Sequence, residues 1–401
     1  MRILFVHEVN WLEKVTYEIH DIPELLSIAG HEVTFIDFPE YSKADFRNHR
    51  FGFRTTRNFG QSRAHIGSKV DVLTPGVVVG GGLGRYFASL TFVPLFWRTA
   101  RSRKIDLVVL YGVPTNGWQT VLLAKFLKIP VIFRAIDIAH LLRETKFQSL
   151  VKLAERYIYR NVDHISAHNE ALKNYCIEMG AAPGRVSIDF PRFDFDRFKP
   201  CARDKDLALS LGIKADQKVV FFRGTLYRFA GLERFIELFS SYLQNNPGTC
   251  FLIVGSGEAE STIREKISKL GLEKQVIMRP FVDYDELVRY ICLADVSVNT
   301  FVPSLVTHCV LPGRVLQSIA CGVPVVSTPL QGMMSYSKGT DTVIYRELDA
   351  SFVDAVTDLL NNPTKSKEIG LASRELVISK GTWQDFVAEF SSLAQKLVAK
   401  R

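Results

Sequence analysis

The residue types best suited to chemistry gather in one stretch, residues 299–329. Within it, Pro312 and Gly313 can open a short helix, because a proline costs little at a helix start. Arg314 and Gln317 follow three residues apart and therefore share one face of that helix. The helix start offers free backbone N–H groups, to which the two side chains add a cation and an amide. This combination predicts a site that holds a phosphate and a ribose.

The chain length and composition indicate what kind of protein carries this site. With 401 residues, 47% hydrophobic and 23% charged, we expect a globular protein of two domains. No apolar run reaches the roughly 18–20 residues of a membrane helix. The first residues read directly as a strand, so we expect no secretory signal. The six cysteines show no CxxC spacing, so we expect no disulfide framework and no zinc site, and a reducing cytoplasm fits.

The positive charge is concentrated in two segments. The net charge is +8, and residues 43–69 carry seven Lys or Arg against one acid, while residues 85–104 carry five against none. One interpretation is a solvated basic face. The other is a surface that meets anionic lipid or a polyanionic acceptor, such as a glycan at the inner face of the membrane. Nucleic acid is not expected as a partner, because no recognition motif accompanies the charge.

Short apolar runs alternate with helical stretches, which predicts parallel sheets in an α/β chain. Residues 191–200 are bounded by prolines and form the best candidate linker between two halves. Residues 382–399 have the spacing of an amphipathic helix, and residues 41–80, without a clear period, predict a long loop. The twelve predicted strands fall six to each half: 2–7, 32–37, 107–111, 131–136, 164–168, 186–190, 218–223, 251–255, 276–281, 296–300, 323–327 and 342–346.

The order of these motifs resembles a known family, the retaining, nucleotide-sugar-dependent glycosyltransferases of the GT-B fold often called family four. The sequence FFRGTLYRFAGL at 221–232 is similar to the first strand and glycine turn of its second domain, and IVGSGEAE at 253–260 to its V-G-x-G turn. GHEV at 30–33, KIDLVVLYG at 104–112 and Trp383 are similar to other landmarks of the family. The resemblance implies two Rossmann-like domains facing a cleft, with a final helix that returns to the first domain.

The resemblance also implies where the domains begin and end and what each domain binds. An acceptor-binding domain would span residues 1–195, a nucleotide-sugar-binding domain 196–380, and the returning helix 381–401. The enzyme would move a sugar from the donor to a glycan, a lipid-linked glycan or a small molecule, with retention of configuration. It would need no cofactor and no metal. Two alternatives remain: a non-catalytic binding or scaffold subunit, and a nucleotide-sugar epimerase.

The donor contacts follow from the family's motifs, taken position by position. The family usually has an Arg and a Lys near the glycine turn, where this chain has Thr225 and Ala230; Arg228 between them is our candidate to stabilise the leaving phosphate. Phe281 and Val282 stand where the family packs the base. The remaining donor contacts implied in this part of the chain are Arg223, Gly224, Thr225 itself and Gly255.

The signature helix departs most from the family pattern of two glutamates separated by seven residues. Those positions hold Cys309 and Gln317, and Gln317 can still bond a ribose diol without charge. Arg314 stands where a phosphate-binding lysine is common. Without the first glutamate, the loop before the helix must hold the donor sugar through its backbone N–H groups or its side chains, which makes Thr307, His308 and Leu311 candidate contacts.

Two further positions in the first half are implied as active-site groups. Asp137 follows the fourth predicted strand, where the family often pairs a His with an Asp, although here the histidine, His140, lies three residues later. Glu8 and Asn10 replace the usual glycine loop after the first strand and are candidates to meet the acceptor.

Overall fold

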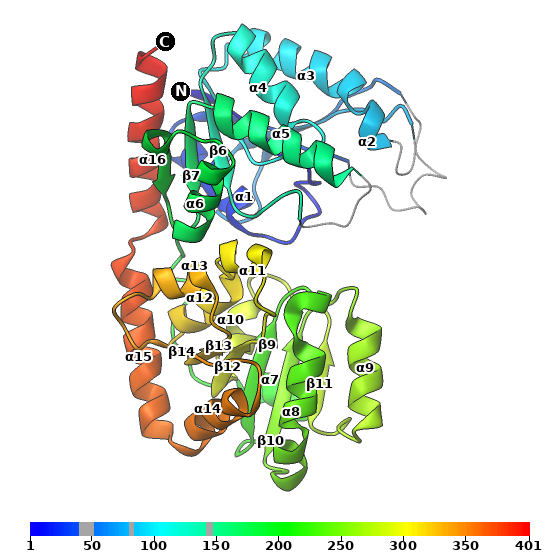
Figure 1. The fold of residues 1–401 in the computed structure, drawn as a ribbon, viewed down its shortest axis with the longest axis vertical. Helices are drawn as coiled ribbons and strands as arrows, with labels where there is room; N and C mark the ends of the chain where they lie inside the picture. The colour runs from blue at the N-terminus through cyan, green and yellow to red at the C-terminus, as the bar shows by residue number, and fades with distance from the viewer. Residues whose placement is uncertain (40–51, 80–83, 142–146) are drawn as a thin grey trace. The chain divides into compact units, whose positions relative to one another are not determined.

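The protein consists of two compact α/β units, drawn in Figure 1. The computed structural model describes residues 1–39, 52–79, 84–141 and 147–401. Unit 1 comprises Met1–Pro191 together with Trp383–Arg401, and unit 2 comprises Arg192–Thr382. The boundary predicted from the sequence, between 195 and 196, lies a few residues later along the chain. The C-terminal helix is part of unit 1.

Unit 1 is built on an eight-stranded sheet in the order β3-β4-β2-β1-β5-β6-β7-β8. All neighbouring strands run parallel except β3 and β4, which pair antiparallel. The inner strands are buried on both faces, which explains their continuous apolar runs. The strands are β1 (Arg2–Val6), β2 (Glu32–Ile36), β3 (Thr56–Gln61), β4 (Val70–Thr74), β5 (Leu107–Leu110), β6 (Val131–Ala135), β7 (His164–Ala167) and β8 (Val186–Ile188).

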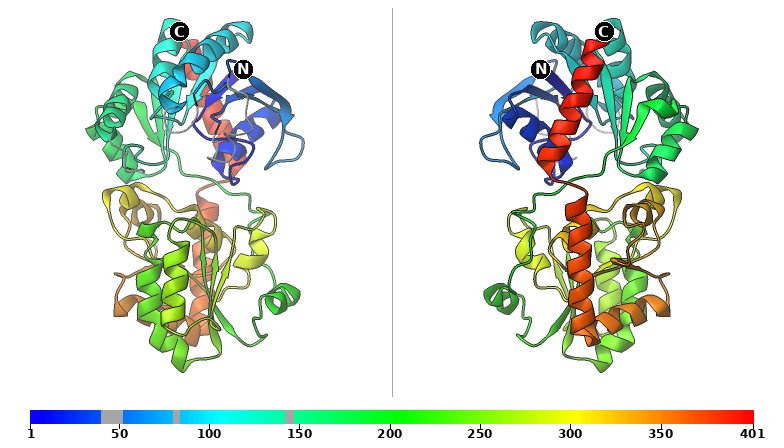
Figure 2. Two further views of the ribbon diagram at one scale, coloured as in Figure 1. Left: turned by 90° about the vertical axis from the view of Figure 1, so that its right-hand side faces the viewer. Right: turned by 90° about the vertical axis from the view of Figure 1, so that its left-hand side faces the viewer.

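Helices cover both faces of this sheet. Figure 2 shows α16, in red, on one side and α3 and α4, in cyan, on the other. α1 packs against α16, while α4 packs against both α3 and α5. The helices of unit 1 are α1 (Glu18–Ile28), α2 (Gly84–Phe87), α3 (Ser89–Ser102), α4 (Gly117–Phe126), α5 (Gln148–Asn161), α6 (Glu170–Glu178), the 3₁₀ turn η3 (Pro183–Arg185) and α16 (Trp383–Ala399).

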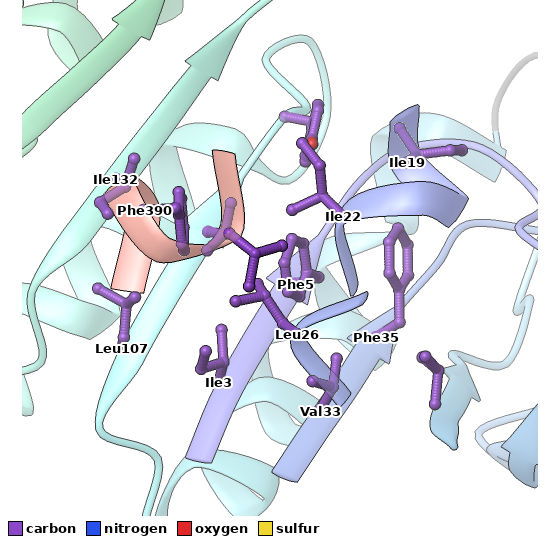
Figure 3. Close-up of a cluster of buried hydrophobic side chains, with 14 of the residues drawn as sticks. Ile3, Phe5, Ile19, Ile22, Leu26, Val33, Phe35, Leu107, Ile132 and Phe390 are labelled. Atoms are coloured by element: carbon purple, nitrogen blue, oxygen red, sulfur yellow. The ribbon is translucent and has the colours of Figure 1, made fainter. Parts of the chain in front are cut away.

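The α16 helix completes the hydrophobic core of unit 1. Phe386 and Phe390 are buried in the same cluster as Phe5 and Phe35 of the central strands, part of which Figure 3 shows. The rings of Phe5 and Phe35 stack with their centroids 6.0 Å apart. The amphipathic spacing of residues 382–399 therefore corresponds to a core-facing helix, as expected.

The described part of residues 41–80 corrects the prediction of a long loop. Residues 52–79 contain β3 and β4, and the turn at 62–68 is fixed to α1. Glu24 accepts hydrogen bonds from the backbone N–H groups of Arg63, Ala64 and His65 at 2.6–3.0 Å. His65 Nε2 lies 2.9 Å from Asp21 Oδ1. The turn needs no periodic sequence of its own, because side chains of α1 hold it in place.

Unit 2 contains a six-stranded, fully parallel sheet in the order β11-β10-β9-β12-β13-β14. This is the order 3-2-1-4-5-6 of a Rossmann fold, with the topological switch point between β9 and β12. Each of these strands overlaps one predicted from the sequence. They are β9 (Lys218–Arg223), β10 (Thr249–Val254), β11 (Val276–Arg279), β12 (Val296–Asn299), β13 (Val325–Ser327) and β14 (Val343–Tyr345).

The helices of unit 2 connect these strands and cover the sheet. The predicted helix after Pro312 is present: Pro312 is the N-cap of α12, and Gly322 follows its end with a φ of 74°. The elements are α7 (Lys205–Ser210), the 3₁₀ turn η4 (Arg228–Ala230), α8 (Leu232–Asn245), α9 (Glu260–Lys269), α10 (Leu287–Ile291), α11 (Leu305–Cys309), α12 (Gly313–Ala320), α13 (Gln331–Tyr336), α14 (Ala350–Asn361) and α15 (Pro363–Ser379).

The predicted linker, residues 191–200, packs on unit 2. Phe198 is fully buried, and Asp194 Oδ1 accepts the N–H groups of Asp196 and Arg197 in a tight turn. Directly after it, Cys201 forms a disulfide with Cys292, with the two Cα atoms 5.9 Å apart. This single disulfide was not expected, because the sequence spacing that argued against a disulfide framework does not show that two distant segments meet.

No helix in the described ranges combines the length and the apolar character that crossing a bilayer requires.

Candidate functional site

The carboxyl ends of β9 and β12 meet at the switch point of unit 2. Arg223 ends β9 and is followed by Gly224, while Thr300 and Phe301 follow β12. In open parallel sheets, ligands bind at this crevice because the connections leave the two strands in opposite directions. The sequence-predicted contacts Arg223 and Gly224 therefore lie at the position where the fold favours a ligand.

Arg314 lies across this switch point from the first turn of α12. Its guanidinium carbon is 4.6 Å from the centre of the Phe222 ring and 4.4 Å from that of Phe301. Its Nη1 is buried without a hydrogen-bond partner among the described residues. Burial, and then the nearby charge of Arg223, lower the pKa of Arg314 to about 9. The aromatic rings hold the guanidinium, but nothing described in the protein neutralises it.

Arg223 is the second cation of this site. Its Nη1 donates a hydrogen bond to Oε1 of Gln317, on the same face of α12 as Arg314. Burial lowers its pKa. Within the described part of the chain neither arginine forms an ion pair. Two neighbouring, partly desolvated guanidinium groups without a carboxylate make a site for an anion, because an external negative charge would relieve their repulsion.

Two glycines allow the loops of this site to approach one another. Gly224 has a φ of 137°, and a Cβ there would lie 2.9 Å from the guanidinium carbon of Arg314. A Cβ on Gly255 would lie 1.9 Å from the carbonyl oxygen of Gly224. Leu226 N donates to Ser256 O at 3.1 Å, which ties the two turns together. The glycines are needed for this packing, and the predicted donor contacts of Gly224, Gly255 and the half-buried Thr225 stay predictions.

The loop before α12 departs from the expected donor contacts. Thr307 is buried; its hydroxyl accepts the Ser304 N–H at 2.8 Å and donates to the Val302 carbonyl at 2.8 Å. The bond from the Ser304 N–H, together with the bond from the Thr307 N–H to Ser304 Oγ at 3.2 Å, forms a capping box at α11. Since the hydroxyl is already engaged and enclosed, a donor contact by the Thr307 side chain is not supported.

His308 keeps one ring nitrogen available. Its Nδ1 accepts the Gln331 N–H at the start of α13, at 3.3 Å. This bond leaves the proton of a neutral ring on Nε2, which can donate to a sugar or a phosphate. Leu311 and Cys309 are both buried, so they shape the loop and offer no side-chain contact to a ligand.

The other predicted donor residues lie on exposed turns. Arg228 is exposed in η4, where its backbone N–H donates to Glu258 Oε1 at 3.2 Å. Phe281 is exposed and Val282 half-buried, just beyond the end of β11. Tyr227 stacks on Phe229 with ring centres 4.7 Å apart, which adds an exposed aromatic surface beside Arg228. Their predicted contacts stay predictions.

Asp137 follows β6 in unit 1, as predicted. Burial, and then the nearby Glu155 carboxylate, raise the pKa of Asp137 to about 7. His140 does not lie free beside it: its Nδ1 is 2.7 Å from Oε2 of Glu155, a fully buried residue. Glu155 also accepts the Ala139 N–H at 3.1 Å. The buried carboxylate of Glu155 thus holds the loop that carries Asp137 through bonds to Ala139 and His140.

Glu8 and Asn10 have structural contacts at the end of β1. Glu8 is 6% exposed, and its Oε1 accepts the N–H groups of Thr115 and Asn116, both at 2.7 Å. It therefore fixes the turn that leads into α4. Asn10 Oδ1 accepts the Leu12 N–H at 3.2 Å. These bonds give both polar side chains a structural role. Their predicted contact with the sugar acceptor stays a prediction.

Sequence reasoning missed a buried ion cluster in unit 1. Arg134, inside β6, donates to Glu18 Oε1 at 3.0 Å and to Oε2 at 2.9 Å, and His168 Nε2 lies 2.7 Å from the same Oε2. Burial opposes ionisation of Glu18, but Arg134 and His168 outweigh it and hold the pKa of Glu18 well below its usual range. The one available signal was an arginine in an otherwise apolar strand.

A metal centre has no counterpart in the described ranges of the chain, where no group of three His, Cys, Asp or Glu residues is placed to hold an ion.

Comparison with known families agrees with this geometry. Residues 205–376 match the model described as glycosyl transferases group 1, and residues 18–188 match a glycosyl transferase 4-like domain. Each match covers most of one unit, in the expected order. The chain belongs to this glycosyltransferase family. Its fold is GT-B.

Two curated relatives of this glycosyltransferase are similar over part of their length. A D-inositol 3-phosphate glycosyltransferase of Thermobifida fusca is 32% identical over 46% of the chain and 42% of the relative. A GDP-mannose-dependent alpha-(1-6)-phosphatidylinositol monomannoside mannosyltransferase of Mycolicibacterium smegmatis is 28% identical over 51% and 54%. The matched part thus spans about half the length of these relatives.

Solved structures agree with the GT-B fold along the whole chain. Sucrose-phosphate synthase from Thermosynechococcus elongatus superposes with a TM-score of 0.78 at 16% identity, covering 100% of both chains. Anabaena HepE in complex with UDP gives a TM-score of 0.74 at 16% identity, covering 99% of this chain and 100% of that one. At these identities the likeness concerns the fold alone.

Proposed function

We propose that the protein transfers a sugar from a nucleotide-sugar donor, bound by unit 2, to an acceptor bound by unit 1, with retention of configuration. The observation that carries the proposal is the pair Arg223 and Arg314, two uncompensated cations at the switch point of a Rossmann-like sheet. A diphosphate supplies the missing negative charge. The family to which the chain belongs supports the reaction class.

The two arginines would act on the leaving group. When the bond from the sugar to the phosphate breaks, charge develops on the nucleoside diphosphate, and preorganised cations stabilise that charge without reorganisation. Arg314 is held by two aromatic rings and Arg223 by Gln317, so both are fixed before the donor arrives. With two cations provided by side chains, the reaction would not depend on a metal ion.

The acceptor proton would leave through the donor phosphate, which is the route that retention without an enzymatic nucleophile requires. Asp137 would position the acceptor. With its pKa raised to about 7, it exists both as an acid and as a carboxylate near neutral pH, and can donate or accept a hydrogen bond. His308 Nε2 would contact the donor sugar.

The names of the similar proteins guide the choice of substrates. HepE structures contain UDP and UDP-glucose, and the Mycolicibacterium relative is named as a GDP-mannose-dependent phosphatidylinositol monomannoside mannosyltransferase. UDP-glucose and GDP-mannose are therefore the first donors to test, with a lipid-linked glycan as the acceptor class.

One observation favours a second candidate, a GT-B protein that binds nucleotide without transfer. Cys309 is buried where the family carries a glutamate, and the amide oxygen of Gln317 is engaged by Arg223. One lone pair of the Gln317 amide oxygen is therefore already used, and the group offers a ribose fewer acceptor sites than a glutamate does. Such a site would bind the diphosphate with weaker hold on the sugar.

Calorimetry with UDP, GDP, ADP and dTDP tests the proposal, followed by hydrolysis and transfer assays with the matching sugar nucleotide. We expect one diphosphate to bind and its sugar nucleotide to be turned over. Binding without turnover on any acceptor would favour the non-catalytic candidate. Failure of all four diphosphates to bind would overturn both.

A further inference from the structure

Three neighbouring helices of unit 1 form one continuous outer layer, named here the α3–α4–α5 layer. The rings of Trp97 and Phe126 meet with centroids 5.6 Å apart, joining α3 to α4. Lys125 Nζ donates to Asn161 Oδ1 at 2.6 Å, joining α4 to α5. Figure 1 shows the three helices together, in cyan to green. Their outward faces therefore make up a single surface.

All the exposed charge of this layer is positive. The only acid in the three helices is Glu155, which is fully buried beneath His140. None of the basic residues in the layer forms an ion pair with a described carboxylate, although the guanidinium of Arg101 lies 5.4 Å from the centre of the Trp97 ring. The exposed basic residues are Arg98, Arg101, Lys125, Lys152, Arg156 and Arg160.

The same surface exposes large apolar side chains at helical spacing. Trp118, Leu122 and Phe126 form a stripe along α4 and are 42%, 51% and 74% exposed. Leu150 and Leu153 of α5 are 61% and 64% exposed. Leu90 of α3 is half exposed as well. Apolar side chains gathered on one surface in this way mark an interaction site more often than scattered ones do.

The outer helices of unit 2 show what an ordinary solvated surface of this protein looks like. α8 and α9 mix both signs of charge, with Arg264 paired to Glu260 at 2.9 Å and Lys266 to Glu237 at 3.8 Å. No large hydrophobic side chain of these two helices, both fully described, is exposed. The α3–α4–α5 layer therefore differs in charge and in apolar exposure at once.

We propose that the α3–α4–α5 layer docks on an anionic lipid bilayer. Lys and Arg attract acidic headgroups, while Trp118, Leu122 and Phe126 enter the boundary between headgroups and acyl chains. Nucleic acid would use the charge but not the leucines, and a membrane uses both. The link to catalysis rests on the proposed function: a bilayer would present a lipid-linked acceptor to unit 1.

This surface replaces part of the membrane contact that the sequence suggested. Residues 89–102 lie within the predicted segment 85–104, but α4 and α5 were not expected to take part. In the segment 43–69, Arg63 donates to the carbonyls of Trp11 and Lys14 and so serves the fold. The residues Lys43, Arg47 and Arg50 of that segment lie outside the described ranges.

Flotation with vesicles tests the docking. The full chain is mixed with vesicles of phosphatidylcholine containing about a third phosphatidylglycerol, and with vesicles of phosphatidylcholine alone. We expect binding to the anionic vesicles, weakened by salt. Replacing Arg98, Arg101 and Lys152 together by Gln should lower the partition coefficient about 100-fold, roughly fivefold for each charge. Replacing Leu122 and Leu153 by Ser should lower it by a further factor on the order of tenfold.

Matched controls come from unit 2. Lys269→Gln with Lys274→Gln removes exposed charges, and Leu209→Ser removes a leucine that is 77% exposed. These variants should float like the wild type. Equal loss in the controls, unchanged flotation of the layer variants, or no wild-type flotation would each overturn the proposal. Retention on immobilised polyglutamate without vesicle binding would point to an acidic protein and also overturn it.

The same protein samples separate this proposal from the proposed function. The layer variants leave Arg223 and Arg314 untouched, so their affinity for a nucleoside diphosphate should equal that of the wild type. Vesicle binding by a chain that binds no nucleotide would leave the docking surface intact and remove only its link to catalysis.

Discussion

Buried charged side chains near the carboxyl ends of the strands are paired in unit 1 and unpaired in unit 2. In unit 1, Glu8 accepts the two backbone N–H groups just before α4, and Glu18 is bonded to Arg134 and His168. In unit 2, Arg223 and Arg314 meet no carboxylate among the described residues. Both sheets share the Rossmann topology, so topology alone does not create a binding site. The difference teaches that an anion site is a place where the fold leaves its own charge uncompensated.

Breaking the compensated cluster should have the largest effect. Glu18→Ala leaves Arg134 buried without its carboxylate, and removing one partner of a buried ion pair costs about 3–5 kcal/mol. Urea unfolding followed by tryptophan fluorescence measures unit 1 alone, because it holds all four tryptophans: Trp11, Trp97, Trp118 and Trp383.

The control for this change is Glu178→Ala, which removes an exposed acid of α6 and should alter stability by less than about 0.5 kcal/mol. An equal loss in both variants would show that the cluster carries no special weight. Nucleotide affinity of any folded Glu18→Ala protein should not change, since the cluster belongs to the other unit.

Removing an uncompensated charge should affect binding and spare stability. Arg314→Met keeps the packing against Phe222 and Phe301 but removes the cation. Loss of a charge-assisted hydrogen bond, about 1.5–3 kcal/mol, lowers diphosphate affinity roughly 10- to 150-fold in calorimetry. Without ligand, unfolding of unit 2 should be unchanged or shifted to higher temperature, because a buried unpaired charge is gone.

Arg264→Met serves as the control, since this exposed arginine of α9 pairs with Glu260 on the surface. It should bind nucleotide like the wild type. A clear loss of stability in ligand-free Arg314→Met would mean that the arginine is structural, and the contrast between the two units would fail.

Much of the fold could be predicted from the sequence. All twelve predicted strands are present, since buried parallel strands read as short apolar runs. β3 was missed because it lies at the sheet edge, is largely exposed and carries no apolar run. β4 was missed because Asp71 interrupts its short apolar run, although the strand is largely buried. The disulfide of Cys201 and Cys292 was missed because the two residues are 91 positions apart.

The candidate site was harder to predict than the fold. The position of Arg314 followed from helix spacing, and its lack of a partner did not. The capping role of Thr307 and the enclosure of Glu8 depend on backbone groups supplied by the folded chain. Residue type shows what a side chain can do, while its neighbours decide whether that capacity is already used.

The pH dependence of the stability of unit 1 sharpens the comparison, because His7, just after β1, is buried in its neutral form. Burial, and then the charge of Lys14, lower the pKa of His7 to about 3. Below the unfolded value near 6.5, the unfolded chain binds a proton that the folded chain refuses, so stability falls as pH falls. Between pH 6.5 and 5, His7 should contribute a loss of about 1.5 kcal/mol.

Urea unfolding at four pH values, read through tryptophan fluorescence, compares the wild type with His7→Asn. In the variant, the free energy of unfolding should fall less steeply as the pH is lowered, by the part that His7 contributes. Asp37 and Asp137, whose pKa values burial raises to about 7, act with the opposite sign, and the difference between the two proteins cancels them. Parallel slopes in the two proteins would show that His7 titrates normally in the folded chain.

The smallest expected effect distinguishes binding of the ribose from binding of the phosphates in unit 2. Gln317→Met removes the amide whose oxygen accepts a hydrogen bond from Arg223 and whose NH₂ is the proposed donor to the ribose. One hydrogen bond of about 1 kcal/mol corresponds to roughly a fivefold loss of nucleoside diphosphate affinity. Inorganic pyrophosphate, which has no ribose, should bind the variant and the wild type alike, because both arginines remain. Equal weakening of pyrophosphate and nucleotide would mean that Gln317 acts only by holding Arg223 in place, and that the ribose is bound elsewhere.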